Sequence, residues 1–146
     1  MLTWENSIFI NRSQQEVWDF LSNPANEPQW QSGTESAEWT SEGVPGVGST
    51  QRGIGKILGR KIDLPIEVTA WDPPSELGRK SVGGPIQAES TIRLESKEDG
   101  TQLSVHYQGE AGGFFKIAEG LLGKQLEKQT AANFKALKQV LEAGQA

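Results

Sequence analysis

The 146-residue sequence contains no cysteine, one histidine and one tyrosine. Without cysteine, the chain has no disulfide bond, no thiol nucleophile and no cysteine-ligated zinc or iron–sulfur site. Because His106 is the single histidine, neither a two-histidine metal site nor a catalytic relay with a second histidine can be built. These absences exclude metal sites built on cysteine or on two histidines, and we expect no metal and no other cofactor.

The sequence also lacks long hydrophobic runs and concentrated positive charge. No segment approaches the roughly 18 apolar residues of a membrane-spanning helix, and the N-terminus MLTWENSIFI lacks the basic region of a signal peptide. The formal net charge is −5 at pH 7 and the lysines and arginines are scattered, which argues against nucleic-acid binding. We expect a soluble, cytoplasmic protein without stable membrane insertion, folded as one domain over residues 1–146.

The first 30 residues predict one strand and two short helical segments. The apolar residues within 3–10 indicate a strand that is buried on much of both sides. The sequence Ser-Gln-Gln-Glu at 13–16 matches a capping box, in which a hydroxyl and a carboxylate satisfy free backbone N–H groups. A short helix is therefore expected over about 13–22. Pro24 and Pro28 enclose three residues, which predicts a single helical turn between them.

From residue 34 onward the hydrophobic period becomes two, which is typical of strands. Turn-forming glycine, proline and aspartate residues separate the strand-like segments. The strongest hairpin signal is Asp99-Gly100. The sequence therefore predicts an antiparallel meander. Its six strand segments are 34–41, 48–59, 60–71, 76–83, 85–96 and 101–110.

Alternation along the strands predicts which side chains face the core. In IDLPIEV (62–68) the aliphatic residues face one way and the acidic residues the other. In the last strand Leu103, Val105 and Tyr107 share the dry face, and His106 lies on the wet face. Since one face is dry, another element must cover it.

The segment 114–143 has no proline and a helical spacing of apolar residues, so it is the expected cover. Gln129 and Asn133 interrupt its apolar stripe. Either they lie at the edge of the stripe and reach solvent or a carbonyl group, or they face a cavity in which an amide meets a ligand or water. The stripe consists of Leu122, Leu126, Gln129, Asn133, Leu137, Val140 and Leu141.

Two other patterns are interpreted as structural. GIGKILG (53–59) has the spacing G-x-G-x-x-x-G inside a strand-like run and does not open a helix, so it predicts a bulged, close-packed hairpin, not a phosphate-binding loop. Glutamate pairs such as Glu35 with Glu38 fall where strands meet turns and are expected to be solvated.

Three segments carry a resemblance to a known family. They are IFINRSQQEVWDFLSNPANEPQW (8–30), VTAWDPPSELGRKS (68–81) and ANFKALKQVLE (132–142). In their order and spacing the chain resembles the START-like helix-grip superfamily, also called SRPBCC, and within it a small, single-domain member of the polyketide cyclase/dehydrase type. The resemblance covers essentially the whole chain.

This resemblance implies an α+β helix-grip fold. A seven-stranded antiparallel sheet curls around the long C-terminal helix, with an elongated cavity between them and two short helices between strands 1 and 2 closing one side. The partner it implies is a small hydrophobic molecule. The residues expected to contact this ligand are Trp18, Trp30, Ile66, Ser90, Tyr107, Phe115, Leu122 and Gln129.

Three functions stay open at this point. The leading hypothesis is binding or transport of a lipid, isoprenoid or polyketide-like molecule. The second is a cyclase/dehydratase-type enzyme, with Tyr107 as first candidate and Arg52, Arg79 or His106 as helper; surface positions are favoured for these three helpers. The third is a protein–protein adaptor, which would need a large exposed apolar patch.

Overall fold

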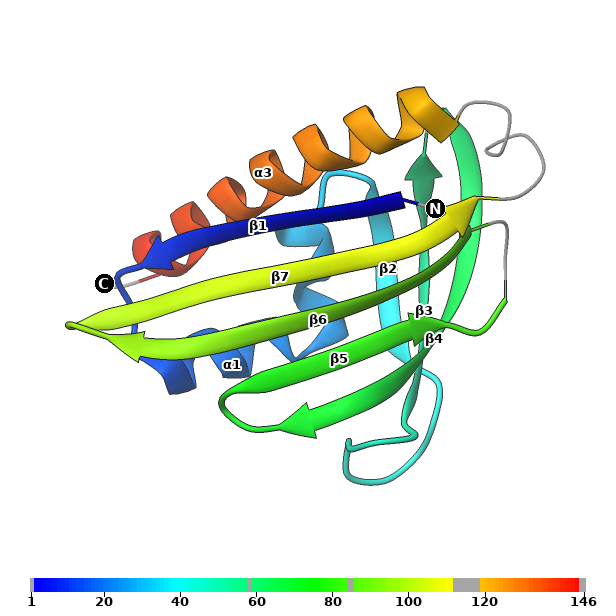
Figure 1. Ribbon diagram of the computed structural model, residues 1–146. Helices are drawn as coiled ribbons and strands as arrows, with labels where there is room; N and C mark the ends of the chain where they lie inside the picture. Colours follow the sequence, from blue (N-terminus) through cyan, green and yellow to red (C-terminus); the bar gives the residue numbers. More distant parts are fainter. Residues whose placement is uncertain (1, 58, 84–85, 112–118, 145–146) are drawn as a thin grey trace.

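Seven antiparallel strands form one curled sheet, and a long C-terminal helix runs along one edge of it (Figure 1). The computed structural model describes residues 2–57, 59–83, 86–111 and 119–144. The strands are hydrogen-bonded in the order β1-β7-β6-β5-β4-β3-β2. The elements are β1 (Leu2–Ile10), α1 (Gln14–Leu21), the 3₁₀ helix η1 (Pro24–Gln29), β2 (Thr34–Trp39), β3 (Thr50–Ile57), β4 (Arg60–Asp72), β5 (Glu76–Ser81), β6 (Ile86–Lys97), β7 (Gly100–Ala111) and α3 (Glu119–Ala143). This architecture confirms the predicted α+β helix-grip fold.

The start of α1 follows the predicted capping motif in part. The Ser13 hydroxyl accepts a hydrogen bond from the backbone N–H of Glu16 at 3.2 Å, as an N-cap does. The Glu16 carboxylate, however, accepts from the Ser13 hydroxyl at 2.9 Å and from the Arg12 guanidinium at 3.3 Å. The reciprocal bond of a full capping box is thus replaced by these two contacts. The helical turn predicted between the two prolines is present as η1.

The β6–β7 hairpin forms where the Asp99-Gly100 signal predicted it, but the turn is shifted by one residue. Lys97 pairs with Gly100, so Glu98 and Asp99 are the turn residues. Glu98 has a φ of 54°. Gly100 is instead the first residue of β7, where an added Cβ would lie 2.5 Å from the carbonyl oxygen of Ile10. A close approach of β1 therefore requires glycine at this position.

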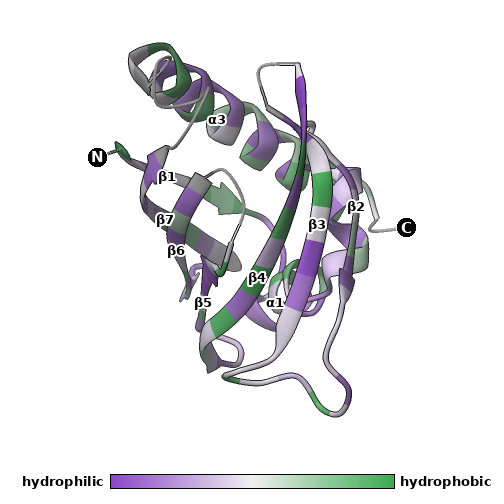
Figure 2. Ribbon diagram, turned by 90° about the vertical axis from the view of Figure 1, so that its right-hand side faces the viewer, coloured by the Kyte–Doolittle hydropathy of each residue, from purple (hydrophilic) through white to green (hydrophobic). Residues whose placement is uncertain are grey.

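The concave face of the sheet is the hydrophobic face that the alternation predicted. Along β4, hydrophobic and hydrophilic residues alternate (Figure 2). In β7, Leu103 and Val105 are buried and Tyr107 is half-buried, whereas His106 is exposed. The ladder between β1 and β7 runs without a register shift, so no bulge turns His106 inward.

The C-terminal helix α3 is attached to the sheet mainly along β1. The indole Nε1 of Trp4 donates to the Thr130 hydroxyl at 2.9 Å. Near the end of the helix, the Arg12 side chain donates to the carbonyl of Leu141 at 2.8 Å, and the Lys138 ammonium donates to the carbonyl of Phe9 at 2.7 Å. These bonds fix α3 at one edge of the concave face.

The predicted stripe on α3 is correct in direction, but it missed two positions. Leu122 and Leu137 are fully buried as expected, and so is Phe134, which the predicted stripe omitted. Thr130, also omitted, is buried and bonded to Trp4. Apolar spacing alone could not select Thr130, because its burial depends on a hydrogen-bond partner 126 residues away.

Candidate functional site

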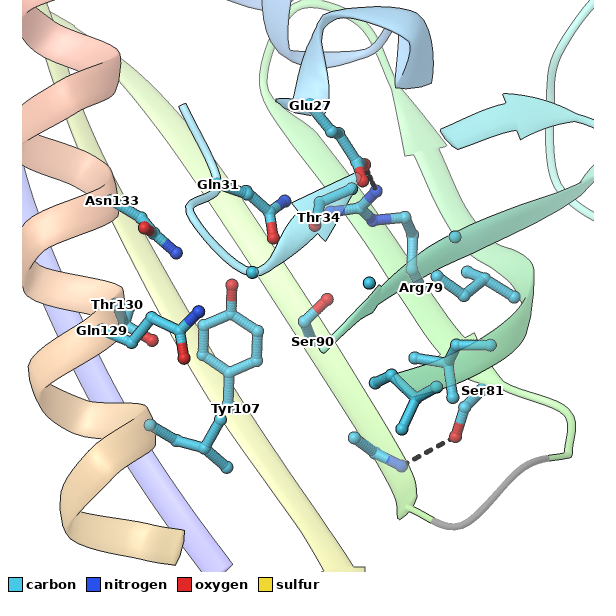
Figure 3. Close-up of a pocket in the computed structure, with 18 of the residues that line it drawn as sticks. Glu27, Gln31, Thr34, Arg79, Ser81, Ser90, Tyr107, Gln129, Thr130 and Asn133 are labelled. Atoms are coloured by element: carbon cyan, nitrogen blue, oxygen red, sulfur yellow. Dashed lines mark hydrogen bonds and ion pairs between the residues drawn. The ribbon is translucent and has the colours of Figure 1, made fainter. Parts of the chain in front are cut away.

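A cavity of about 220 Å³ lies between α3 and the concave face of the sheet (Figure 3). Much of its wall is aliphatic or aromatic, and β4 supplies three adjacent aliphatic side chains of the predicted dry face. Such a wall favours an apolar guest. The apolar lining residues are Trp4, Trp30, Ile54, Ile62, Leu64, Ile66, Ala88, Leu126 and Phe134.

Two glycines of β3 create part of this space. Gly53 is paired with Leu64 and Gly55 with Ile62, so both glycines lie on the concave face, opposite side chains that line the cavity. A Cβ added at Gly53 would meet no atom within 4 Å. Gly53 therefore leaves room that a larger residue would fill.

The cavity extends toward the surface between α3 and β3. Gly33, Lys56 and Gln129 line both the cavity and an open surface depression outside it. Ser32 bridges to α3 at this place, because its backbone N–H donates to the side-chain oxygen of Asn133 at 3.1 Å. Gln129 and Asn133 thus lie at the edge of the helix stripe, where both contact Ser32, and they also line the cavity. Contact of either amide with a ligand or water stays a prediction.

Among the neutral polar side chains that point toward the cavity are Gln31, Thr34, Ser90 and Tyr107 (Figure 3). Within the described part of the chain, none of the four side chains has a hydrogen-bond partner. The Tyr107 ring stacks on Trp4 at a centroid distance of 4.8 Å, which leaves its hydroxyl directed into the space. Burial raises the pKa of Tyr107, so its hydroxyl is a neutral donor at neutral pH.

A buried ion pair forms another part of the wall. The Arg79 guanidinium donates to the Glu27 carboxylate at 2.5 Å and to the side-chain oxygen of Gln51 at 3.4 Å. All three residues are less than one-tenth exposed. Burial is the strongest single effect and acts to lower the pKa of Arg79. The Glu27 charge, the hydrogen bond to Glu27 and the Tyr107 side chain together outweigh it, so the pKa is raised and Arg79 stays charged.

The comparisons with known proteins agree with this architecture. A sequence model of the family described as "Polyketide cyclase / dehydrase and lipid transport" matches residues 1–142. The chain belongs to this family. No curated protein matches this family member.

Solved structures resemble this polyketide cyclase/dehydrase family member over nearly their full length. A conserved protein from Geobacillus kaustophilus is 27% identical, with a TM-score of 0.79 over 97% of this chain and 96% of that one. A protein from Thermus thermophilus is 17% identical, with a TM-score of 0.85 and 99% of both chains covered. The Zhui aromatase/cyclase from a Streptomyces species is 17% identical, with a TM-score of 0.80 over 96% of this chain and 93% of that one. At such low identity the last two likenesses show the fold alone.

The structure of this family member brings several of the predicted residues to the cavity and leaves others out. Trp30, Ile66, Ser90, Tyr107 and Gln129 line it. Their role in ligand binding stays a prediction.

Trp18 and Leu122 do not line the cavity, which corrects two predictions. Trp18 is 4% exposed and packs edge-on against Trp71 in the core cluster, at a ring-centroid distance of 5.1 Å. Leu122 is fully buried against Leu2 and Trp4, in a smaller cluster where α3 meets β1. Both are core residues. Phe115 lies outside the described residues.

The three proposed helper residues divide between surface and interior. Arg52 is exposed and pairs with Asp63 across β3 and β4, and exposed His106 contacts Glu5 at 2.8 Å. Neither lines the cavity, because both side chains point to the convex face. Arg79, for which a surface position was favoured, is instead buried at the cavity. This placement was wrong because the compensating charge, Glu27, lies 52 residues earlier in the chain.

Sequence reasoning also missed Glu27, Gln31 and Thr34. Glu27 sits between Pro24 and Pro28, and its position in a turn gave no reason to expect burial. The one available signal was the position of this charge three residues before Trp30, a residue expected to contact the ligand. The indole Nε1 of Trp30 is itself buried, and it has no hydrogen-bond partner among the described residues.

The described residues form neither a membrane-spanning helix nor a metal-binding cluster. None of the helices in that part of the chain is long and apolar enough to cross a membrane. The same residues contain no group of three or more His, Cys, Asp or Glu side chains arranged to hold a metal ion.

Proposed function

We propose that this protein binds a compact hydrophobic molecule in the cavity between α3 and the sheet. The observation that carries the proposal is the cavity of about 220 Å³, whose wall is largely apolar and includes a few polar side chains without a hydrogen-bond partner among the described residues. This combination is typical of sites that bury most of a small ligand and orient it by hydrogen bonds. The family description, which includes lipid transport, is consistent with it.

The size of the cavity narrows the proposal to small ring compounds. A cavity of about 150 Å³ lined by aliphatic and aromatic residues is enough to hold benzene, and drug-sized ligands use about 300–1,000 Å³. The 220 Å³ found here lies between these values and fits one or two fused rings. A long-chain lipid would require the walls to move apart, so we place it second.

Filling the cavity tests the proposal directly. The variant Gly53→Leu adds a side chain where a Cβ meets no other atom, so it should fold normally and weaken binding of the bicyclic probe 2-naphthamide by about tenfold or more. Fluorescence titration or calorimetry with purified protein measures this affinity. Gly120→Leu is the matched control, because it adds the same side chain in open space on the exposed start of α3. Equal affinity in wild type and Gly53→Leu would place binding outside the cavity.

A second candidate function is catalysis of the cyclase/dehydratase type in the same cavity. It is favoured by Arg79 and Tyr107, two of the four candidate groups, which line the cavity. Both would stabilise a developing negative charge on oxygen as donors. Neither acts as a general base at neutral pH, because the pKa of each is raised. Conversion of a reactive poly-β-ketone by wild type, lost in Tyr107→Phe, would support an enzyme over a carrier.

The adaptor hypothesis has little support. Among the described residues the strongly exposed large hydrophobic side chains are Val44, Val47, Val82 and Leu121. Val44 and Val47 share the loop between β2 and β3, and two valines are small compared with the patches that mark protein interfaces.

A further inference from the structure

The Glu27–Arg79 ion pair links two elements across the end of the cavity. Glu27 comes from η1 and Arg79 from the middle of β5, and both line the cavity (Figure 3). Their side chains are 7% and 10% exposed, so water screens them little. The net charge of the pair is zero. Because the two charges neutralise each other, a charged group of a ligand bound beside them would have no free counter-ion in the pair.

Hydrogen-bond donors without a partner lie at and next to this pair. Both hydrogen bonds that the Arg79 side chain makes within the described residues start from Nη1. Its Nε and Nη2 groups have no partner there. The Tyr107 hydroxyl is also unpartnered, and its raised pKa keeps it protonated. A guest oxygen placed here would accept hydrogen bonds from a charged group without adding charge.

We propose that Glu27 determines the selectivity of the cavity: by neutralising Arg79, it makes the site prefer a compact guest with a neutral acceptor, such as a carbonyl group, over one with a carboxylate. This inference rests on the proposed function. A carbonyl oxygen leaves the site at zero net charge. A carboxylate leaves it with one buried negative charge, which must sit near Glu27 without a counter-ion of its own.

Other charged residues near the cavity do not change this balance. Lys56 lies at the exposed rim, where solvent screens it. Glu89 accepts a hydrogen bond from Gln108, which is exposed on the neighbouring strand, so the Glu89 side chain points to the convex face. Lys80 lies opposite Glu89 in the ladder and shares that face.

Two probes of almost identical shape test the inference. 2-Naphthamide carries a neutral carbonyl group, and 2-naphthoate carries a carboxylate that is ionised at pH 7. We expect wild type to bind the amide at least about tenfold more tightly than the carboxylate, as expected for a charge juxtaposed with a buried like charge. Similar affinities for the two probes in wild type would overturn the proposal without the need for any variant.

Substitution of Glu27 should then change the preference. Glu27→Gln keeps the length of the side chain and an oxygen that accepts from Arg79, but it leaves the site with one positive charge. We expect the ratio of the two affinities to shift toward the carboxylate by about tenfold or more. The double variant Glu27→Gln/Arg79→Gln restores zero net charge and should restore the preference for the amide. Asp63→Asn is the matched control, because it removes a carboxylate from an exposed pair with Arg52.

The outcomes separate this inference from the proposed function. If wild type binds neither probe, the binding function itself is contradicted, and the selectivity with it. If the amide binds and Gly53→Leu blocks it, but Glu27→Gln leaves the ratio unchanged, the cavity is a binding site and Glu27 does not set its selectivity. A shift of the same size in Asp63→Asn would show a general charge effect and would also overturn the role of Glu27.

Discussion

The hydroxyl group of Tyr107 is placed where a guest would meet it, and its chemistry follows from its surroundings. Desolvation raises its pKa, and the nearby Glu27 charge acts in the same direction, while Arg79 opposes them. The result is a hydroxyl that donates a hydrogen bond over the whole neutral range. This favours a role in orienting a guest over one in abstracting a proton.

Tyr107 is the single tyrosine, so its ionisation can be followed without interference. We expect the near-ultraviolet absorbance of tyrosinate to rise with a midpoint above the ordinary pKa of about 10 in the folded protein. Because the pKa of Tyr107 is raised in the folded protein, its contribution to the free energy of unfolding is complete below the unfolded-state pKa of about 10. This contribution is lost as the pH rises through the higher pKa of the folded state. The variant Tyr107→Phe should show no tyrosinate absorbance, and its free energy of unfolding should fall less as the pH is raised above 10. A midpoint at or below 10 would contradict the burial of the hydroxyl.

At the scale of elements, the β2–β3 pair is held together by the close approach of two glycines. The backbone N–H of Lys56 donates to the carbonyl of Gly33 at 2.8 Å. A Cβ at Gly55 would lie 1.9 Å from that carbonyl oxygen, which is a severe clash with backbone. The register shift between Thr34 and Ser36 lies beside this contact. The hairpin expected over 53–59 is the β3–β4 hairpin, and its ladder runs without a register shift, so the expected bulge was wrong there. The irregularity lies instead at the start of β2, against β3.

This contact predicts different effects for two neighbouring glycines. Gly55→Ala should lower the free energy of unfolding by about 1–3 kcal/mol, because the backbone of β2 must move to accommodate the methyl group. Gly53→Ala lies on the same strand and face, where the methyl group meets open space, and should leave stability unchanged or raise it by up to about 1 kcal/mol. Urea denaturation of both variants measures the difference. Equal stabilities would show that the Gly33–Gly55 contact relaxes without cost.

At the scale of the whole molecule, α3 is held firmly on one side of the cavity and lightly on the other. Toward β1 it makes several hydrogen bonds, including those of Thr130 and Lys138. Toward β2 it is joined through Ser32, whose N–H and hydroxyl both approach the Asn133 side-chain oxygen, at 3.1 and 3.2 Å. On the proposed function, we expect the ligand to pass at this exposed junction, because breaking its hydrogen bonds disturbs no buried packing.

Loosening that junction should speed the exchange of a guest. We expect Asn133→Ala to raise both the association and dissociation rate constants of 2-naphthamide by about two- to tenfold, the effect of losing hydrogen bonds worth about 1 kcal/mol. Stopped-flow fluorescence measures both constants. Gln139→Ala removes an amide from the exposed face of the same helix and should leave them unchanged. A rise in the dissociation rate constant with an unchanged association rate constant would mean that Asn133 contacts the ligand and does not limit its passage.

Much of this architecture was accessible from the sequence because it depends on local chemistry. The hydroxyl of Ser13, the prolines around η1, the period of two in β4 and the spacing along α3 each act over a few residues. Their order matched that of a known fold, and the strand alternation correctly placed Tyr107 on the dry face and His106 on the wet face.

The features that give the cavity its chemistry arise from distant pairs. Glu27 and Arg79 are 52 positions apart, and each alone would be expected at the surface, because a buried charge is stable only with a partner. Trp18 was expected to contact the ligand because it is aromatic, but it packs against Trp71, 53 positions later, and so belongs to the core. The volume of the cavity depends on how far α3 stands from the glycines of β3. This distance results from the packing of all the elements together, so it cannot be predicted from any one segment of the sequence.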